Sequence, residues 1–338
     1  MAQPILSVVL PAHNAEAHLR AAIDSVLEQS FKDFELIVIN DGSTDHTGEI
    51  LGAFNDPRIR LILHGSNKGL IEALNAGIQT STGRYIARMD ADDISEPTRF
   101  QRQIEYLEMH PEIGVLGSAI KVINQWDRVL ATVLMPSTAI DIEWAMPLVC
   151  PLAHPSVMMR SDIVKHAGGY PAGAVHVEDY ELWWRLSRNT RITNLSIPLL
   201  RLRKHCGSVT STQRHTHLNS AAAVSKAEID SWFDESVPIR SVRCLRSWGA
   251  SDPECALSAT RLLSRLLVRL CSKYPPASVR TARRDAAIRT LYLSRLVAGR
   301  ARIRILRDVL DMDPFALLGL ARKTIHRLIP GVSRSLIG

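Results

Sequence analysis

Apolar runs alternate with helix-like segments through the first hundred residues, and this rhythm limits the folds open to the chain. Leu19, Ile23 and Val26 recur at helical spacing, and a second helix is predicted over about residues 69–79. Four apolar runs have the length and composition of buried strands: residues 5–10, 36–39, 60–64 and 85–87. Strands that alternate with helices predict a parallel, doubly wound sheet, whose ligands bind beyond the carboxyl ends of the strands.

Polar loops follow directly on three of these strands, at residues 11–14, 41–45 and 90–93. By the rule for parallel sheets, all three loops should line one crevice. Two have simpler explanations: Asn14 can cap the following helix, and the Asp41 loop is ordinary turn chemistry. The chain has no G-x-G-x-x-G and no G-K-[ST] motif, so neither a dinucleotide fingerprint nor a P-loop is predicted.

The loop at residues 90–93 holds three carboxylates, those of Asp90, Asp92 and Asp93. Like charges packed this closely repel one another unless a cation lies among them. Mg²⁺ takes one or two protein carboxylates and leaves its other positions to water and substrate phosphates. The alternative is a solvated acidic turn that caps the next helix. The position directly after a buried strand favours the cation site.

Composition describes an ordinary globular protein: 338 residues, 46% hydrophobic and 22% charged, enough for two domains. No apolar run reaches the ~18 residues that span a bilayer, and the N-terminus has no secretory signal pattern. The five scattered cysteines form no C-x-x-C pair, which argues against a zinc site or a disulfide framework. A cytoplasmic protein is therefore predicted.

Two acidic residues begin a helix predicted over residues 178–186. Glu178 and Asp179 are favoured there by the helix dipole, which is a purely structural explanation. The dipole also keeps a carboxylate ionised at neutral pH, so that it can act as a base. Further on, His205 lies in a basic stretch; most lone histidines are not metal ligands, and spacing alone does not make this one a ligand.

Five blocks in this order and spacing resemble the family 2 glycosyltransferases, which are inverting enzymes with the GT-A nucleotide-sugar-binding fold. The blocks are residues 7–14, 37–45, 67–77, 83–93 and 178–179. The resemblance covers roughly residues 5–210. It implies an α/β fold with a Rossmann-like, mixed, mostly parallel sheet flanked by helices.

The resemblance also implies roles for individual residues. Asp179 matches the catalytic base, with Glu178 before it. Asp92 matches a ligand of Mn²⁺ or Mg²⁺, and His205 matches a residue that reaches the metal or closes over the diphosphate. The residues implied to bind the nucleotide-sugar are Pro11, Ala12, Asn14, Asp41, Lys68, Arg84, Asp90 and Asp93.

The predicted function is metal-dependent, inverting transfer of a sugar from a nucleotide-sugar, by default a UDP-sugar, to a glycan or lipid-linked acceptor in cell-surface polysaccharide synthesis. The chain lacks the Q-x-x-R-W element and the membrane-spanning helices of the family's processive members, which predicts a non-processive enzyme. The alternative is a non-catalytic nucleotide-sugar sensor or scaffold on the same fold. The presence of both Asp92 and Asp179 disfavours it.

The charge balance divides the chain into a predicted catalytic domain, residues 1–235, and a basic helical region, residues 236–338. The first holds 21 Lys and Arg against 28 Asp and Glu (net −7), and the second holds 20 against 6 (net +14). Leucines alternate with Arg261, Arg265 and Arg269 at helical spacing. One hypothesis is peripheral attachment to the cytoplasmic face of the inner membrane. The alternative is a helical subdomain packed on the catalytic domain, and a nucleic-acid partner is not predicted.

Overall fold

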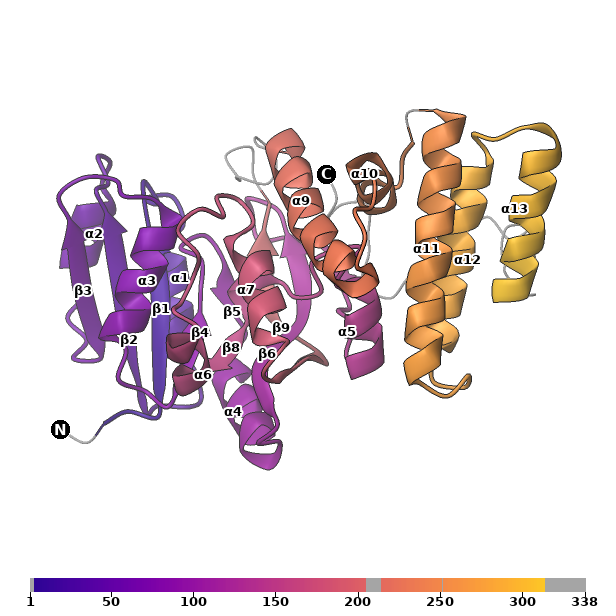
Figure 1. Ribbon diagram of the computed structural model, residues 1–338. Coiled ribbons are helices and arrows are strands. Elements are labelled where there is room, and N and C mark those ends of the chain that lie inside the picture. Colours follow the sequence, from indigo (N-terminus) through magenta and orange to yellow (C-terminus); the bar gives the residue numbers. More distant parts are fainter. Residues whose placement is uncertain (1–2, 205–213, 251, 314–338) are drawn as a thin grey trace. The chain divides into compact units, whose positions relative to one another are not determined.

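The structure is a computed structural model that describes residues 3–204, 214–250 and 252–313 (Figure 1). The chain divides into two compact units. One comprises residues 1–137 with 152–208, and the other comprises residues 138–151 with 209–338. Helix α9 (Arg214–Phe233), which the sequence analysis assigned to the catalytic domain, falls in the second unit.

A single mixed sheet forms the centre of the first unit, with the strand order β3-β2-β1-β4-β8-β6-β9-β5 and with β7 paired to β6. The strands are β1 (Leu6–Ala12), β2 (Phe34–Asp41), β3 (Ile59–His64), β4 (Tyr85–Arg88), β5 (Ile94–Ser95), β6 (Ile113–Ile123), β7 (Val129–Val133), β8 (Met158–Arg160) and β9 (Arg191–Arg203). Strands β3, β2, β1 and β4 are parallel, as are β6 and β9. The predicted α/β class with a mixed sheet is confirmed.

Helices cover this sheet because its parallel strands are apolar on both faces. Every residue of β1 is buried. Helix α3 packs on β1 and β2 so closely that a Cβ on Gly77 would lie 2.4 Å from Val9 Cγ1 (Figure 1). The helical segments of this unit are α1 (Leu19–Leu27), α2 (Thr47–Gly52), α3 (Leu70–Thr80), α4 (Arg99–Met109), η1 (His154–Ser156), α6 (Ser161–His166) and α7 (Glu178–Leu186).

The strand register brings the polar loops to one edge of the sheet. Ala12 at the end of β1 lies opposite Asn40 of β2, and Val9 lies opposite Arg88 at the end of β4. Farther across the sheet, the parallel strands β6 and β9 end together, with Ile123 opposite Arg203. The loops that follow β1, β2, β4 and β6 therefore open on the same side.

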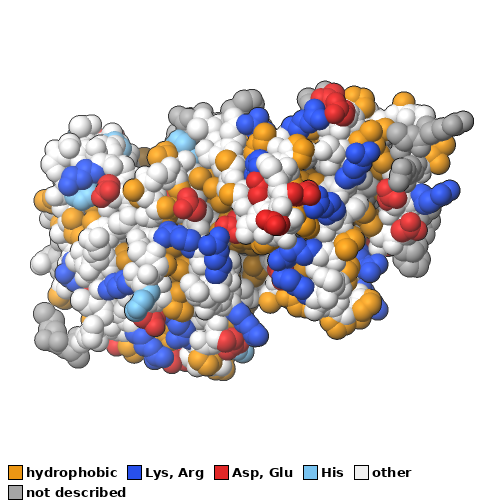
Figure 2. Space-filling view, in the orientation of Figure 1, with side chains coloured by type: hydrophobic (Ala, Val, Ile, Leu, Met, Phe, Trp, Pro, Cys, Tyr) orange, Lys and Arg blue, Asp and Glu red, His pale blue; other side chains and the backbone are white. Residues whose placement is uncertain are grey.

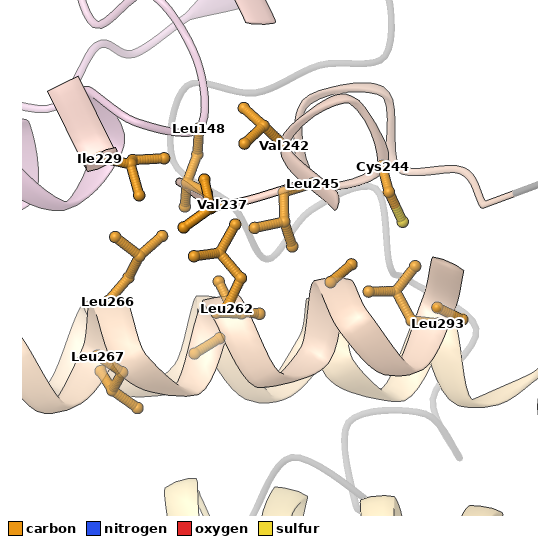
Figure 3. Packing of buried hydrophobic residues seen from close by; sticks show 14 of the residues in the cluster. Leu148, Ile229, Val237, Val242, Cys244, Leu245, Leu262, Leu266, Leu267 and Leu293 are labelled. Atoms are coloured by element: carbon orange, nitrogen blue, oxygen red, sulfur yellow. The ribbon is translucent and has the colours of Figure 1, made fainter. Parts of the chain in front are cut away.

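The second unit is helical. It contains α5 (Ala139–Ala145), α9, α10 (Ile239–Ser247), α11 (Pro253–Lys273), α12 (Arg280–Ser294) and α13 (Gly299–Met312). Figure 3 shows Leu262 and Leu266 of α11 directed toward Val237 and Leu245 in the core of this unit. The leucine stripe that suggested a membrane-surface helix is thus used for packing inside the unit, which favours the helical-subdomain alternative for α11.

On the face drawn in Figure 2, the Lys and Arg side chains are interspersed with acidic and apolar ones. Across the described ranges, none of the helices is long and apolar enough to cross a membrane. The last part of the region predicted to be basic and helical, residues 314–338, lies outside the described residues.

Candidate active site

The acidic loop after β4 brings three carboxylates together. One oxygen from each of Asp90, Asp92 and Asp93 lies within 4.8 Å of the other two. Asp93 is 2% exposed, and its Oδ1 accepts a hydrogen bond from the backbone N–H of Arg203 at 2.8 Å. Within the described part of the chain, its buried Oδ2 has no hydrogen-bond partner. A buried carboxylate oxygen without a donor is a suitable ligand for a cation.

Burial works against the negative charge of this loop. It raises the pKa of Asp93 well above its ordinary value, and the charges of Asp90 and Asp92 raise it further. Burial also raises the pKa of Asp90, although the guanidinium of Arg88 forms an ion pair with it and opposes the change. The single guanidinium of Arg88 does not compensate the charges of three carboxylates. The residues of the cluster therefore fit a divalent cation with oxygen ligands.

Arg203, at the end of β9, holds the acidic loop in place. Its side chain is 2% exposed. Its Nε donates to the carbonyl oxygen of Asp92 at 2.7 Å. On its other side, Nη1 donates to the carbonyl oxygen of Asn124 at 3.1 Å and lies 2.5 Å from Asp127 Oδ1. One buried side chain therefore joins the acidic loop to the turn between β6 and β7.

Helix α7 presents Glu178 and Asp179 from its first turn, as predicted. The apolar face that fixes this helix includes Tyr180, Leu182 and Trp183, all buried. Burial and the charge of Asp179 raise the pKa of Glu178 to about 7. The charge of Asp179 also contributes to the raised pKa of Asp90, after burial and the charge of Asp92. The acidic pair at the start of α7 therefore lies close enough to the acidic loop for the charge of Asp179 to act on Asp90.

The pKa of Glu178 leads to a testable pH dependence. A carboxyl whose pKa is raised by folding binds its proton more tightly in the folded chain, so stability is lost as pH rises from about 4.5 through about 7. We expect the melting temperature of Glu178→Gln to rise relative to wild type between about pH 5 and pH 8. The measurement is thermal unfolding in chelator, and the difference between the two proteins isolates Glu178.

The melting temperatures of Glu178→Gln and wild type must be compared because a buried histidine also makes stability depend on pH. His154 Nε2 lies 2.7 Å from the hydroxyl of Tyr170, and burial holds its pKa well below the ordinary value, with the charge of Arg88 acting in the same direction. Its protonation in the unfolded chain therefore lowers stability as pH falls, opposite to Glu178. Both proteins contain His154, so its effect cancels. A melting difference that stays constant over the range would contradict the expected role of Glu178.

Asp41, at the end of β2, is 3% exposed and already has several partners. The ring Nδ1 of His64 lies 2.6 Å from its Oδ1, and the backbone N–H groups of Lys68 and Gly69 donate to its two oxygens at 3.0 and 2.8 Å. Burial alone would raise the pKa of Asp41, but these hydrogen bonds outweigh it and the pKa falls below its ordinary value. Asp41 thus fixes the start of α3 as well as facing the predicted crevice.

The end of β1 lies at the same edge of the sheet, with Ala12 opposite Asn40. Pro11 and Ala12 are buried, and Asn14 is exposed with a positive φ of 48°. Asn14 does not cap α1, which begins at Leu19. Instead its Oδ1 accepts a hydrogen bond from the N–H of Thr44 at 2.9 Å. The loops after β1 and β2 are therefore tied together at the edge where the nucleotide is predicted to bind.

The other three predicted residues have no side-chain contact with this arrangement among the described residues. Arg84 precedes β4, at the end of the strand opposite to Asp90, and its Nη1 pairs with Glu108 at 2.8 Å. The side chain of Lys68 is exposed, and only its backbone is seen to bond to Asp41. His205 lies outside the described residues.

No role was predicted from the sequence for Arg88 or Arg203, and the pairing of His154 with Tyr170 was not predicted either. One feature of the sequence could have pointed to Arg88, because clustered carboxylates require a nearby cation. Trp183 and Trp184, which follow the acidic pair in α7, are both buried. In the structure they belong to the core behind α7.

Comparison with known proteins identifies the family of the chain. The family model described as glycosyl transferase family 2 matches residues 7–167. A protein of Haemophilus influenzae described as an uncharacterized glycosyltransferase is 30% identical over 250 residues, which cover 69% of this chain and 75% of that protein. The Escherichia coli UDP-Glc:alpha-D-GlcNAc-diphosphoundecaprenol beta-1,3-glucosyltransferase WfaP is 30% identical over 210 residues, 62% of this chain and 81% of that one.

The fold has solved counterparts as well. Residues 1–349 of Staphylococcus aureus TarS, in complex with UDP-GlcNAc, match with a TM-score of 0.56 and 17% identity, over 93% of this chain and 92% of that one. Fold, site and relatives together define a glycosyltransferase with a GT-A fold. The chain belongs to glycosyl transferase family 2.

Proposed function

We propose that this enzyme transfers a sugar, with inversion, from a UDP-sugar to a hydroxyl group of a glycan or lipid-linked acceptor in cell-surface polysaccharide synthesis. The observation that carries the proposal is the cluster of Asp90, Asp92 and Asp93, one oxygen of each lying within 4.8 Å of the other two. The charge of Asp179, the candidate base, acts on Asp90 of this cluster. WfaP, by its name, uses UDP-Glc and a lipid-linked acceptor, and TarS was solved with UDP-GlcNAc. Both support a UDP-sugar donor.

The residues of the site suit the two demands of the reaction. The loops after β1 and β2, with Pro11, Ala12 and Asn14, would hold the nucleotide. A Mn²⁺ or Mg²⁺ ion on Asp92, with Asp93 beside it, would supply Lewis-acid stabilisation of the diphosphate leaving group. Asp90, ion-paired with Arg88, would lie by the ribose.

Asp179 is the proposed general base. The acceptor hydroxyl gives its proton to the Asp179 carboxylate while its oxygen bonds to the anomeric carbon, and the bond from that carbon to the diphosphate oxygen breaks with its electron pair. A single base opposite the leaving group inverts the anomeric carbon in one displacement. Glu178, with a pKa raised to about 7, is largely protonated below neutrality.

A donor panel tests the proposal. We expect UDP-sugars, in the presence of Mn²⁺ or Mg²⁺, to raise the melting temperature of the protein, and GDP- and dTDP-sugars to raise it less. Asp92→Ala should lose the metal-dependent part of the shift, since the diphosphate then lacks its bridging cation. Measurement is by thermal shift, followed by UDP release in the presence of candidate acceptors.

Two outcomes would count against parts of the proposal. Equal shifts with all three nucleotides would remove the preference for UDP. Binding without any sugar transfer or donor hydrolysis would favour the sensor or scaffold alternative.

We further propose that the enzyme is non-processive and works at the cytoplasmic face of the inner membrane, where lipid-linked acceptors are presented.

A further inference from the structure

The turn between β6 and β7 exposes an unusual group of apolar side chains. Trp126 is 71% exposed, Val129 55% and Leu130 60%. The chain has six tryptophans, all within the described residues, and Trp126 is the exposed one among them. Large apolar side chains that gather at one exposed place mark a contact with a partner or a membrane.

The backbone N–H groups of Trp126, Asp127 and Arg128 are already bonded within the turn. Asn124 Oδ1 accepts hydrogen bonds from the N–H groups of Trp126 and Arg128, both at 3.0 Å. The N–H of Asp127 donates to the carbonyl oxygen of Asn124 at 3.1 Å. A glycan site would need such donors for hydroxyl groups, whereas a lipid environment requires backbone groups that are bonded internally.

The charges of the turn also suit a membrane surface. The carboxylate of Asp127 lies 2.5 Å from the guanidinium of Arg203, so its negative charge is compensated. Arg128 is exposed beside it. A tryptophan and a cation at the tip of a hairpin are typical of the bilayer interface, where each Lys or Arg near an anionic leaflet contributes about 1 kcal/mol.

The size of the apolar group argues against a protein partner. A stable protein–protein interface buries about 800 Å² on each side, with some 20–30 residues. Three side chains at the tip of one hairpin are far fewer than that, yet they are enough to enter the interfacial layer of a bilayer.

We propose that the tip of the β6–β7 hairpin, residues 124–130, inserts Trp126 of the turn and Val129 and Leu130 at the start of β7 into the interfacial layer of an anionic membrane. Because Arg203 bonds both this turn and the acidic loop, the membrane contact lies next to the sugar-transfer site. A lipid-linked acceptor would then reach the site without leaving the bilayer surface. The membrane contact goes beyond the proposed function and can be measured without any donor.

Tryptophan fluorescence of the full chain gives the first test, with vesicles of phosphatidylethanolamine and phosphatidylglycerol as the probe. We expect the emission to shift to shorter wavelength when vesicles are added, and brominated phospholipid to quench it. Trp126→Phe should still bind the vesicles, since Phe remains apolar, but should lose the shift. A full shift that persists in this variant would overturn the proposal, as would the absence of any vesicle binding.

A matched pair of leucines gives the second test. Leu130 in β7 and Leu63 in the edge strand β3 are both exposed, at 60% and 69%. We expect Leu130→Ser to lower the vesicle partition coefficient about tenfold, and Leu63→Ser to leave it unchanged. Equal partition of both variants contradicts the proposal. So does a Trp126 signal that responds to soluble glycan and not to vesicles, which would assign the turn to the acceptor sugar.

The shift in melting temperature on adding UDP, measured on the wild-type preparation, tests the proposed donor binding, whereas vesicle partition tests the membrane contact. Either proposal can therefore be contradicted while the other stands.

Discussion

Asp179→Asn is expected to lower kcat by about 10²- to 10⁴-fold, the usual contribution of a general base. The amide keeps the shape of the side chain in the first turn of α7 but cannot accept the proton of the acceptor hydroxyl. The donor does not depend on this proton transfer, so nucleotide binding should persist. The measurement is the initial rate of UDP release at saturating donor and acceptor, with the thermal shift by UDP as the test of donor binding.

Glu181→Gln is the matched control for this variant. Glu181 lies in the same first turn of α7, two positions beyond Asp179, and is partly buried. The change removes a carboxylate from the same helix end and so removes a similar favourable interaction with the helix dipole. If both variants lose activity equally, the effect belongs to the helix end and not to a base. If Asp179→Asn keeps wild-type kcat, Asp179 is not the base.

The first half of the fold could be predicted from the sequence because its signals are local. Strands β1 to β4 are short apolar runs, and their helices follow at regular spacing. The second half depends on contacts between distant segments. β8 is three residues long and runs antiparallel to β4, and β9 pairs with β6 in parallel and with β5 in antiparallel fashion. No local pattern specifies which distant strand a short segment will join.

The site shows the same division between local and distant information. The position of the acidic loop after a strand, and of Glu178 and Asp179 at a helix start, follows from local pattern. The capping role expected of Asn14 was wrong, because its side chain bonds instead to Thr44, thirty positions away. Arg203 could not be identified, since its contacts with Asp92 and Asn124 depend on the arrangement of β9 beside β6.

Arg84 and Arg88 show how much burial changes the meaning of a residue. They begin and end the same short segment around β4, and each pairs with one acid. The side chain of Arg84 is 61% exposed and that of Glu108 is 43% exposed, so water screens this pair. Arg88 is 4% exposed and lies among carboxylates, where its charge is difficult to replace. Replacing Arg84 and replacing Arg88 are therefore expected to change the stability of the protein by very different amounts.

Arg88→Met is expected to lower the free energy of unfolding of the metal-free protein by about 3–5 kcal/mol, because it leaves buried Asp93 and partly buried Asp90 without the buried cation beside them. Arg84→Met, the exposed counterpart, should cost less than about 1 kcal/mol. Both are measured by urea unfolding in chelator.

The double variant Arg88→Met with Asp90→Asn removes both partners and should recover part of the loss, since the remaining amide carries no charge to be left unpaired. Recovery on adding Mn²⁺ to the single variant would have the same cause, a cation restored among the acids. Equal losses for Arg84→Met and Arg88→Met would mean instead that burial gives the Arg88 pair no special weight, and that the acidic loop does not depend on a protein cation for its stability.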